Sequence, residues 1–365
     1  MQPLKILSFG AGAIGTYIGG SLALAKHTVV FVEQPQAAEL LRRTGLKLNL
    51  SLDPRRRVDD SGQSQTGQAE YELAPAQIVI SDSLAEALTH GPFDVALFAL
   101  KSYDTPAALE GMQLYAKELP PILCLQNGVD NEPAIEALLG VQKVIYGTVT
   151  SAVGRRGVGD IVLEKLRGVG IAAGHSLSER LVEAFNAAYL NARLFNQAAD
   201  MKWSKLLTNL LANPTSAILD MTATEVFAHA GLYKLEIAQL SECLAVMQAQ
   251  GISVVDLPGT PVRALALATK LPLWLSKPFL SKAAGAGRGA KMPSFHIDLH
   301  SGRGKSEVAY LHGAVVRAGE KSGVATPVNK LLTTTLLEMT AGSMPLTEFS
   351  HNPEKLIARL GRKPL

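Results

Sequence analysis

The stretch "KILSFGAGAIGTYIGGSLALA" (residues 5–25) decides the fold of the first half of the chain. "KILSF" is a short apolar run typical of a buried strand, and "IGTYIGGSLALA" is typical of a helix. The turn between them, "GAGAIG", has the spacing G-x-G-x-x-G. A strand, a glycine turn and a helix in this order form the first βα unit of dinucleotide-binding domains. The stretch therefore predicts dinucleotide binding.

The three glycines of this turn have separate roles in such a unit. Gly10 permits the tight turn, Gly12 lets the backbone approach a pyrophosphate, and Gly15 allows the helix to pack closely against the strand. The helix start, with the backbone N–H groups of Ala13 and Ile14, offers free donors and a partial positive charge to the anion. We therefore expect these five residues to bind the cofactor.

An acidic residue follows the next predicted strand. Glu33 comes directly after "TVVFV" and 21 positions beyond Gly12, where a carboxylate can accept hydrogen bonds from the hydroxyls of the adenine ribose. The carboxylate would also repel a 2′-phosphate, although Arg42 and Arg43 nearby could reduce that repulsion. The sequence predicts NAD(P)H as the cofactor, with NADH favoured by Glu33.

Short apolar runs alternate with helical stretches from residue 4 to about residue 195. The further predicted strands are "QIVIS", "DVALFAL", "PILCLQN" and "KVIYGTVTSAVG". This alternation predicts a mostly parallel sheet covered on both faces, with residues 53–70 as a polar surface insertion. Helical periodicity dominates the rest. We expect a Rossmann-type α/β domain over residues 1–196 and an all-α domain over residues 197–365, which binds the substrate and carries the catalytic residues.

The composition suits a cytoplasmic protein with two domains. Hydrophobic residues make up 47% of the 365 residues and charged residues 18%, which is enough apolar material for a large core. The net charge of +3 does not indicate nucleic-acid binding. We find neither a signal-peptide pattern nor an apolar run of about eighteen residues. The two cysteines, Cys124 and Cys243, are expected to be buried thiols in a reducing compartment.

Two polar residues are predicted at the ends of neighbouring strands. Lys101 follows "DVALFAL", and Asn127 closes "PILCLQN". In open α/β sheets, ligands bind outside the carboxyl ends of the strands. A lysine at this edge can bind a cofactor phosphate or a substrate carboxylate, and an asparagine amide can bridge ribose and nicotinamide. We therefore count both residues among the candidate ligands of cofactor and substrate.

The stretch "MKWSKLLTNLLANPTSAIL" (residues 201–219) is predicted to be one leucine-rich helix with a narrow polar strip. Lys205, Asn209 and Asn213 follow one another at four-residue intervals, so they share one helical face. A lysine ammonium on this face could donate a proton to a developing alkoxide, and the two amides could orient a polar substrate. Lys202 lies on the same strip, and helical geometry does not choose between the two lysines.

The glycine turn together with "LKSYDT", "LQNGVDNEP", "WSKLLTNLLANPTSAI" and "KSEVAYLHGAVV" resembles the ketopantoate reductases (2-dehydropantoate 2-reductases) over most of the chain. The resemblance implies reduction of the 2-keto carbon of ketopantoate, or of a similar small 2-keto acid, by a hydride from NAD(P)H in pantothenate biosynthesis. It implies that Lys205 is the general acid and Lys202 a flanking charge. Asn209 and Asn213 would contact the substrate.

The same resemblance implies roles for residues late in the chain. Glu307, in "KSEVAYLHGAVV", would bind the substrate hydroxyl and help hold the catalytic lysine, and Ser294 would contact the substrate carboxylate. Lys101 and Asn127 match positions on the cofactor and substrate sides. From its position alone, Glu307 could also be a first-turn charge that follows Ser306 as a helix cap.

Glu33 stands where members of this family that use NADPH typically carry an arginine. The superfamily also contains NAD-dependent dehydrogenases of branched or aromatic 2-hydroxy acids, of the mandelate type, and Glu33 favours that alternative. A third interpretation is a non-catalytic dinucleotide sensor. It predicts cofactor binding without turnover, and survival of function when Lys205 is replaced.

The segment 256–292 is rich in proline, glycine and basic residues and exceeds the family pattern. We interpret it as a surface excursion or a contact of a homodimer, with a lid over an anionic ligand or a membrane-surface contact as alternatives. The histidines His229, His296, His300 and His312 compete with Lys205 as proton donors. "HIDLH" has two histidines four apart, but as a strand or loop it would not bring them to one ion, so no metal is expected.

Overall fold

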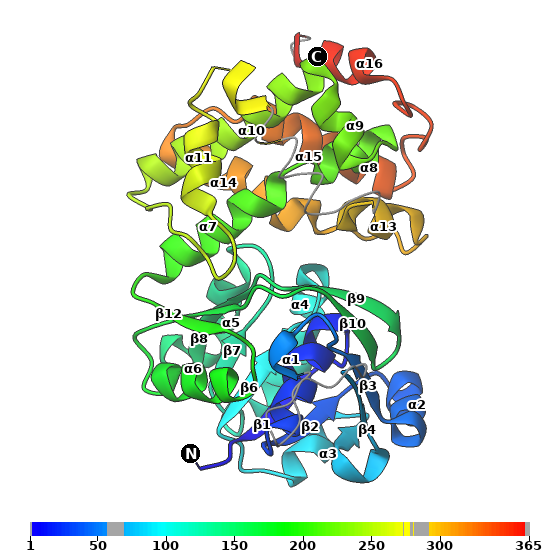
Figure 1. Cartoon of the computed structure of the whole chain (residues 1–365), viewed down its shortest axis with the longest axis vertical. Helices are drawn as coiled ribbons and strands as arrows, with labels where there is room; N and C mark the ends of the chain where they lie inside the picture. Colours follow the sequence, from blue (N-terminus) through cyan, green and yellow to red (C-terminus); the bar gives the residue numbers. More distant parts are fainter. Residues whose placement is uncertain (1, 57–68, 273, 278–279, 281–291, 362–365) are drawn as a thin grey trace. The chain divides into compact units, whose positions relative to one another are not determined.

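The structure, a computed structural model, describes residues 2–56, 69–272, 274–277, 280 and 292–361. The chain divides into two compact units (Figure 1). Unit 1 comprises Met1–Gln126, Asn131–Met201 and Leu257–Thr260, and unit 2 comprises Asn127–Asp130, Lys202–Asp256 and Pro261–Leu365.

Unit 1 is built on an eight-stranded sheet. In spatial order its strands are β12 (Ala192–Phe195), β11 (Val169–Ala172), β8 (Val144–Val149), β7 (Ile122–Cys124), β6 (Val95–Phe98), β1 (Lys5–Phe9), β2 (Thr28–Val32) and β5 (Val79–Ser81). Every neighbouring pair is parallel except β11 and β8. The predicted Rossmann-type, mostly parallel sheet is confirmed, and its carboxyl edge carries the loops of β7, β6, β1 and β2 side by side.

Both faces of this sheet are buried. Ile6 packs into one apolar cluster and its neighbour Leu7 into another, as alternation along a strand requires. Helices of unit 1 lie beside the sheet (Figure 1), and their side chains contribute to the two clusters. They are α1 (Ala13–Leu24), α2 (Pro35–Thr44), α3 (Leu84–Thr89), α4 (Thr105–Met112), α5 (Asn131–Leu139) and α6 (Ser178–Ala187).

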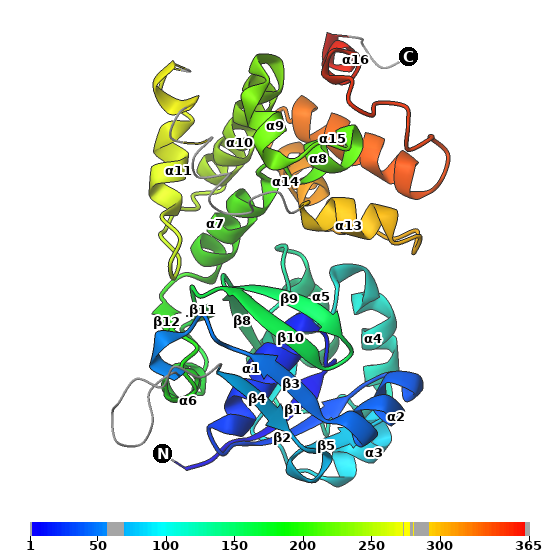
Figure 2. The same ribbon diagram turned by 45° about the vertical axis from the view of Figure 1, so that its right-hand side comes forward.

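A second sheet of four strands was not predicted. Its order is β4 (Glu70–Leu73), β3 (Leu46–Asn49), β10 (Asp160–Lys165) and β9 (Ala152–Gly157) (Figure 2). The predicted single strand "KVIYGTVTSAVG" is wrong, because the run contains both β8 and the start of β9. Of the predicted polar insertion, residues 57–68 lie outside the described part of the chain.

Unit 2 is helical, which confirms the predicted all-α C-terminal half. Helices in the described part of this unit include α7 (Ala198–Leu210, which begins in unit 1), α8 (Asn213–Leu219), α9 (Ala223–Ala228), α10 (Ala230–Ala249), α11 (Val262–Ala268), α13 (Ser294–His300), α14 (His312–Ser322), α15 (Pro327–Thr340) and α16 (Pro353–Ala358). α13 packs against α8, and α14 against α10 and α15 (Figure 1). Among the described helices, none has the length and apolar character that a membrane crossing needs.

The prediction of one helix over residues 201–219 is wrong. α7 ends at Leu210, Ala212 adopts a left-handed conformation with φ of +52°, and α8 begins at Asn213. A proline disfavours α-helical conformation in the residue before it, so a helix seldom continues through such a pair. Pro214 instead occupies the first turn of α8, where a proline is tolerated. The Asn-Pro pair was the signal for this break. Asn213 therefore belongs to a different helix from Lys205 and Asn209.

Candidate active site

The glycine turn has the geometry that a bound pyrophosphate needs. Gly10 has a φ of +90°, and its N–H donates to the carbonyl of Val32 at 2.9 Å. A Cβ on Gly15 would lie 2.0 Å from the carbonyl oxygen of Gly10, so only glycine allows this approach of α1 to the turn. Gly12 caps α1 with no side-chain hydrogen bond, and a Cβ there would have no atom within 4 Å. The start of α1 thus presents bare backbone, as dinucleotide binding requires.

Glu33 lies beside this turn at the end of β2. Its Oε1 accepts a hydrogen bond from the backbone N–H of Ala11 at 2.5 Å, and its Oε2 accepts one from Gln34 N–H at 3.1 Å. Arg42 is engaged elsewhere, because its guanidinium forms ion pairs with Asp82 at 3.0 Å and Glu86 at 3.2 Å. The negative charge at the end of β2 is therefore held against the glycine turn.

The loops after β6 and β7 are joined by a buried polar network. Gln126 donates through Nε2 to the carbonyl of Leu100 at 2.8 Å and to the hydroxyl of Thr105 at 2.9 Å. Asn131 accepts from Thr105 at 3.2 Å and donates to the hydroxyl of Ser102 at 3.2 Å. Sequence reasoning missed this network, which fixes the two loops that carry Lys101 and Asn127.

Four predicted site residues form a continuous hydrogen-bonded chain in unit 2. Asn209 donates through Nδ2 to Oδ1 of Asn127 at 3.1 Å, and its carbonyl accepts from the amide of Asn213 at 3.3 Å. The amide of Asn213 in turn lies 3.4 Å from the hydroxyl of Ser294 and accepts from Phe295 N–H at 3.1 Å. Residues distant in sequence are thus collected around the break between α7 and α8.

A buried carboxylate holds that break in place. Glu236, on α10, is inaccessible to solvent and accepts hydrogen bonds from Ala212 N–H at 2.7 Å and from the hydroxyl of Thr215 at 2.6 Å. Gln239, one turn later, donates to Glu236 at 2.6 Å, and its amide oxygen lies 3.0 Å from Nε2 of His312. Sequence reasoning missed Glu236. The sequence did carry a signal for it, because Glu236 is an acidic residue between Leu235 and Ile237 in a segment with the apolar periodicity of a helix.

The predicted catalytic pair lies in the same unit. Lys205 is half-buried in α7, one turn before Asn209, whereas Lys202 is buried. Glu307 is also buried and opens the short 3-10 helix Glu307–Tyr310, after the N-cap Ser306. The helix that Ser306 and Glu307 were expected to open is therefore only this short turn, and α14 begins separately at His312. The catalytic roles of Lys205 and Glu307 stay predictions.

The prediction that "HIDLH" is a strand or loop is wrong. The segment belongs to α13, where residues four apart share one face. The rings of His296 and His300 lie side by side, with centroids 4.2 Å apart. Contrary to the expectation, the two histidines therefore lie close together.

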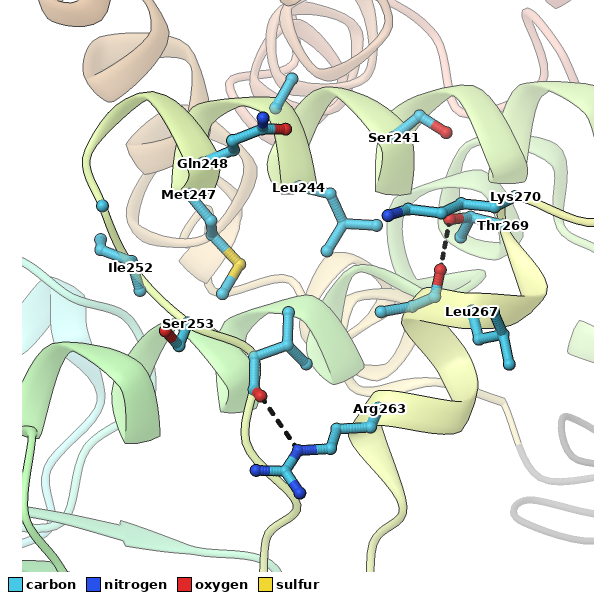
Figure 3. A pocket seen from close by; sticks show the side chains of 14 residues that line it. Ser241, Leu244, Met247, Gln248, Ile252, Ser253, Arg263, Leu267, Thr269 and Lys270 are labelled. Atoms are coloured by element: carbon cyan, nitrogen blue, oxygen red, sulfur yellow. Dashed lines mark hydrogen bonds between the residues drawn. The ribbon is translucent and has the colours of Figure 1, made fainter.

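Unit 2 also has an open cavity of about 710 Å³ along α10 and α11 (Figure 3). Leu244, Met247 and Ile252 give it an apolar wall, and Arg263 and Lys270 lie at its edge. The described residues that line it include none of the predicted site residues. This cavity is therefore separate from the asparagine chain.

Two family profiles match the chain in succession. The profile "Ketopantoate reductase PanE/ApbA" matches residues 6–174, and "Ketopantoate reductase PanE/ApbA C terminal" matches residues 197–340. The 2-dehydropantoate 2-reductase of Streptococcus pyogenes serotype M1 is 24% identical over 332 residues, which cover 89% of this chain and 94% of that protein. The 2-dehydropantoate 2-reductase of Archaeoglobus fulgidus is 24% identical over 336 residues, covering 91% and 96%.

Solved structures share the fold of this chain. A PanE/ApbA family ketopantoate reductase from Ralstonia eutropha superposes with a TM-score of 0.74 and 24% identity, covering 93% of this chain and 99% of that one. A D-mandelate dehydrogenase in complex with NADH and anilino(oxo)acetate superposes with a TM-score of 0.71 and 20% identity, covering 93% and 99%. At these identities the superpositions establish the fold alone.

Proposed function

The chain belongs to the ketopantoate reductase PanE/ApbA family of oxidoreductases, and we propose that it reduces ketopantoate or a similar small 2-keto acid to the 2-hydroxy acid with NAD(P)H. The observation that carries the proposal is the hydrogen-bonded chain through Asn127, Asn209, Asn213 and Ser294. It offers uncharged donors and acceptors to a polar substrate, one helical turn from Lys205.

The cofactor would be held by unit 1 at the carboxyl edge of the large sheet. The backbone of Gly10, Gly12, Ala13, Ile14 and Gly15 would bind the pyrophosphate at the start of α1. Glu33 would accept hydrogen bonds from the adenine ribose, and Lys101 and Asn127 would bind on the phosphate and nicotinamide sides. When bound, the reduced nicotinamide supplies the hydride.

The proton for the reaction would come from Lys205. As the 2-keto carbon accepts a hydride, negative charge develops on its oxygen, and the Lys205 ammonium stabilises that charge and then transfers a proton to it. Lys205 is left neutral and the product is the 2-hydroxy acid. Glu307 would accept a hydrogen bond from the product hydroxyl and hold the lysine, while Ser294 contacts the substrate carboxylate.

We propose NADH as the preferred cofactor. The carboxylate of Glu33 lies against the glycine turn, and Arg42 is paired with Asp82 and Glu86. A 2′-phosphate would therefore meet the negative charge of Glu33 at the end of β2, where Arg42 is already paired with other carboxylates.

A panel of initial rates tests both proposals. NADH and NADPH oxidation are followed with ketopantoate and with branched and aromatic 2-keto acids, using the purified full-length chain. Ketopantoate should give the highest kcat/KM, and NADH should exceed NADPH. Absence of turnover with every 2-keto acid would contradict the proposal, and a large preference for NADPH would contradict the role of Glu33.

One observation favours a second function. Glu33 matches NAD use, and a D-mandelate dehydrogenase with bound NADH shares the fold. A 2-hydroxy-acid dehydrogenase of this type would oxidise mandelate-like acids with NAD and leave ketopantoate unreduced. The same panel, extended to the reverse reaction, distinguishes the two functions.

A further inference from the structure

Three metal-ligating side chains converge where α8 ends against α13. Asp220, His296 and His300 each offer one ligand atom, and these atoms all lie within 4.8 Å of one another. Nε2 of His296 lies 2.7 Å from Oδ1 of Asp220. The cluster uses none of the residues assigned above to the reaction.

The fold brings these side chains together from distant parts of the sequence. His296 and His300 are four apart on α13, so both project from one face of the helix. Asp220 ends α8 in a left-handed conformation with φ of +52°. α8 and α13 pack against each other (Figures 1 and 2), and Asn213 at the start of α8 accepts a hydrogen bond from Phe295 N–H at 3.1 Å. The two helices are therefore held in register near both ends of α8.

A fourth candidate ligand lies beside the cluster. His351 donates its backbone N–H to the carbonyl of Leu219 at 2.8 Å, which places its Nε2 4.0 Å from Oδ2 of Asp220. His351 is therefore close enough to Asp220 to serve as a further ligand of an ion held there.

We propose that Asp220, His296 and His300 form a binding site for a divalent transition-metal ion of the Zn²⁺ type. Two imidazoles and one carboxylate suit zinc, cobalt or nickel, whereas magnesium and calcium prefer oxygen ligands alone. Tetrahedral ligands about 2.1 Å from a metal lie about 3.4 Å from one another, so on binding His296 and Asp220, now 2.7 Å apart, would separate slightly, and the wider spacings of the cluster would close to that distance. Water or His351 completes the coordination.

The ion would tie the end of α8 to α13. Because it binds ligands from both helices, it stabilises their packing in the folded chain by mass action. These helices also begin with Asn213 and Ser294, but the metal site does not depend on the proposed reductase function. Its test therefore measures binding and stability and needs no turnover.

The test uses the full-length chain without a polyhistidine tag, stripped of metal with a chelator. Titration with Co²⁺ should give a visible absorption band that saturates at one ion per chain, and Zn²⁺ should displace the cobalt. Added Zn²⁺ should also raise the Tm, whereas Mg²⁺ should not. A wild-type chain with no saturable cobalt band, or a Tm that responds equally to Mg²⁺, overturns the proposal.

Matched variants locate the ion. Asp220→Asn and His300→Gln should each weaken Co²⁺ binding at least about 10-fold, the lower limit seen when even an outer-shell partner is lost. His300 is exposed at the end of α13, so His300→Gln should keep the metal-free Tm and remain informative if Asp220→Asn is unstable. His90→Ala, at an exposed position in unit 1, should bind cobalt like the wild type. Wild-type affinity in His300→Gln overturns the proposal.

Discussion

At the residue scale, Lys205 lies one helical turn before Asn209 on α7 and is the proposed proton donor. Lys205→Ala should lower kcat by at least about 100-fold, the usual contribution of a positioned general acid, while the Tm stays close to that of the wild type. The measurement is kcat with the best 2-keto acid, together with thermal unfolding.

Lys234 on α10 provides the control for Lys205. It is an exposed lysine of the same unit that takes no part in the proposed site, so Lys234→Ala should leave kcat unchanged. If Lys205→Ala turned over at a near-normal rate, the proton would come from Lys202 or a histidine instead.

Glu33 should set the cofactor preference. Glu33→Gln keeps an amide oxygen that can accept from Ala11 N–H but removes the charge that opposes a 2′-phosphate. The ratio of kcat/KM with NADPH to that with NADH should rise about 10-fold, which corresponds to about 1.4 kcal/mol. Glu39→Gln, an exposed position on α2, should leave the ratio where it is. Equal ratios in wild type and Glu33→Gln would remove Glu33 from cofactor selection.

At the element scale, Glu236 joins α10 to the break between α7 and α8. Glu236→Ala leaves the buried N–H of Ala212 and hydroxyl of Thr215 without their acceptor, and each such loss costs about 1–3 kcal/mol. The free energy of unfolding should fall by at least about 2 kcal/mol, and KM should rise because Asn213 begins the displaced helix. Urea unfolding of this variant beside Lys234→Ala measures the effect. An unchanged midpoint would show that the break forms without Glu236.

Elements with a clear local period could be predicted from the sequence. β1, β2, β6 and α1 lie close to where the apolar pattern places them, because burial on both faces of a parallel sheet makes their composition distinctive. The four-stranded sheet could not be predicted. β10 pairs with β3, which lies in a distant part of the chain, and no local sequence pattern indicates which strand will be its neighbour.

In the candidate site, too, some positions could be predicted from the sequence and others could not. Glu33, Lys101 and Asn127 could be placed at the sheet edge from topology alone, because parallel strands carry their loops at one edge. The contact of Asn213 with Ser294 could not be placed, since it depends on the turn at Ala212 and hence on Glu236. The helical wheel joined Lys205 to Asn213 across a break that the Asn213-Pro214 pair signals, but whose geometry is fixed by tertiary hydrogen bonds.

At the scale of the whole molecule, resistance to acid should depend on His312. This side chain is buried beneath the break, and burial lowers its pKa to about 3 from the ordinary value of 6.5, against a smaller opposing effect of the Leu210 carbonyl. Below pH 6.5 the unfolded chain binds a proton that the folded chain excludes until about pH 3. The free energy of unfolding should therefore fall as the pH drops through this window, by up to about 1.4 kcal/mol per pH unit, and His312 should contribute no such slope above it.

Replacing His312 can also change stability by altering the packing of the core. The dependence of the Tm on pH, rather than the Tm at one pH, therefore reports the titration of His312. His312→Gln removes the titrating group, so the Tm of the variant should decline less steeply than that of the wild type between pH 6.5 and pH 4.5. The other groups with shifted pKa values that titrate in or near this range, His27, Asp220, Glu225 and Glu242, are present in both proteins, so their contributions cancel in the comparison. His90→Gln, at an exposed histidine, should follow the wild-type curve. Parallel curves for wild type and His312→Gln would mean that the folded chain accepts a proton at this position, and hence that water reaches the polar network beneath α7 and α8.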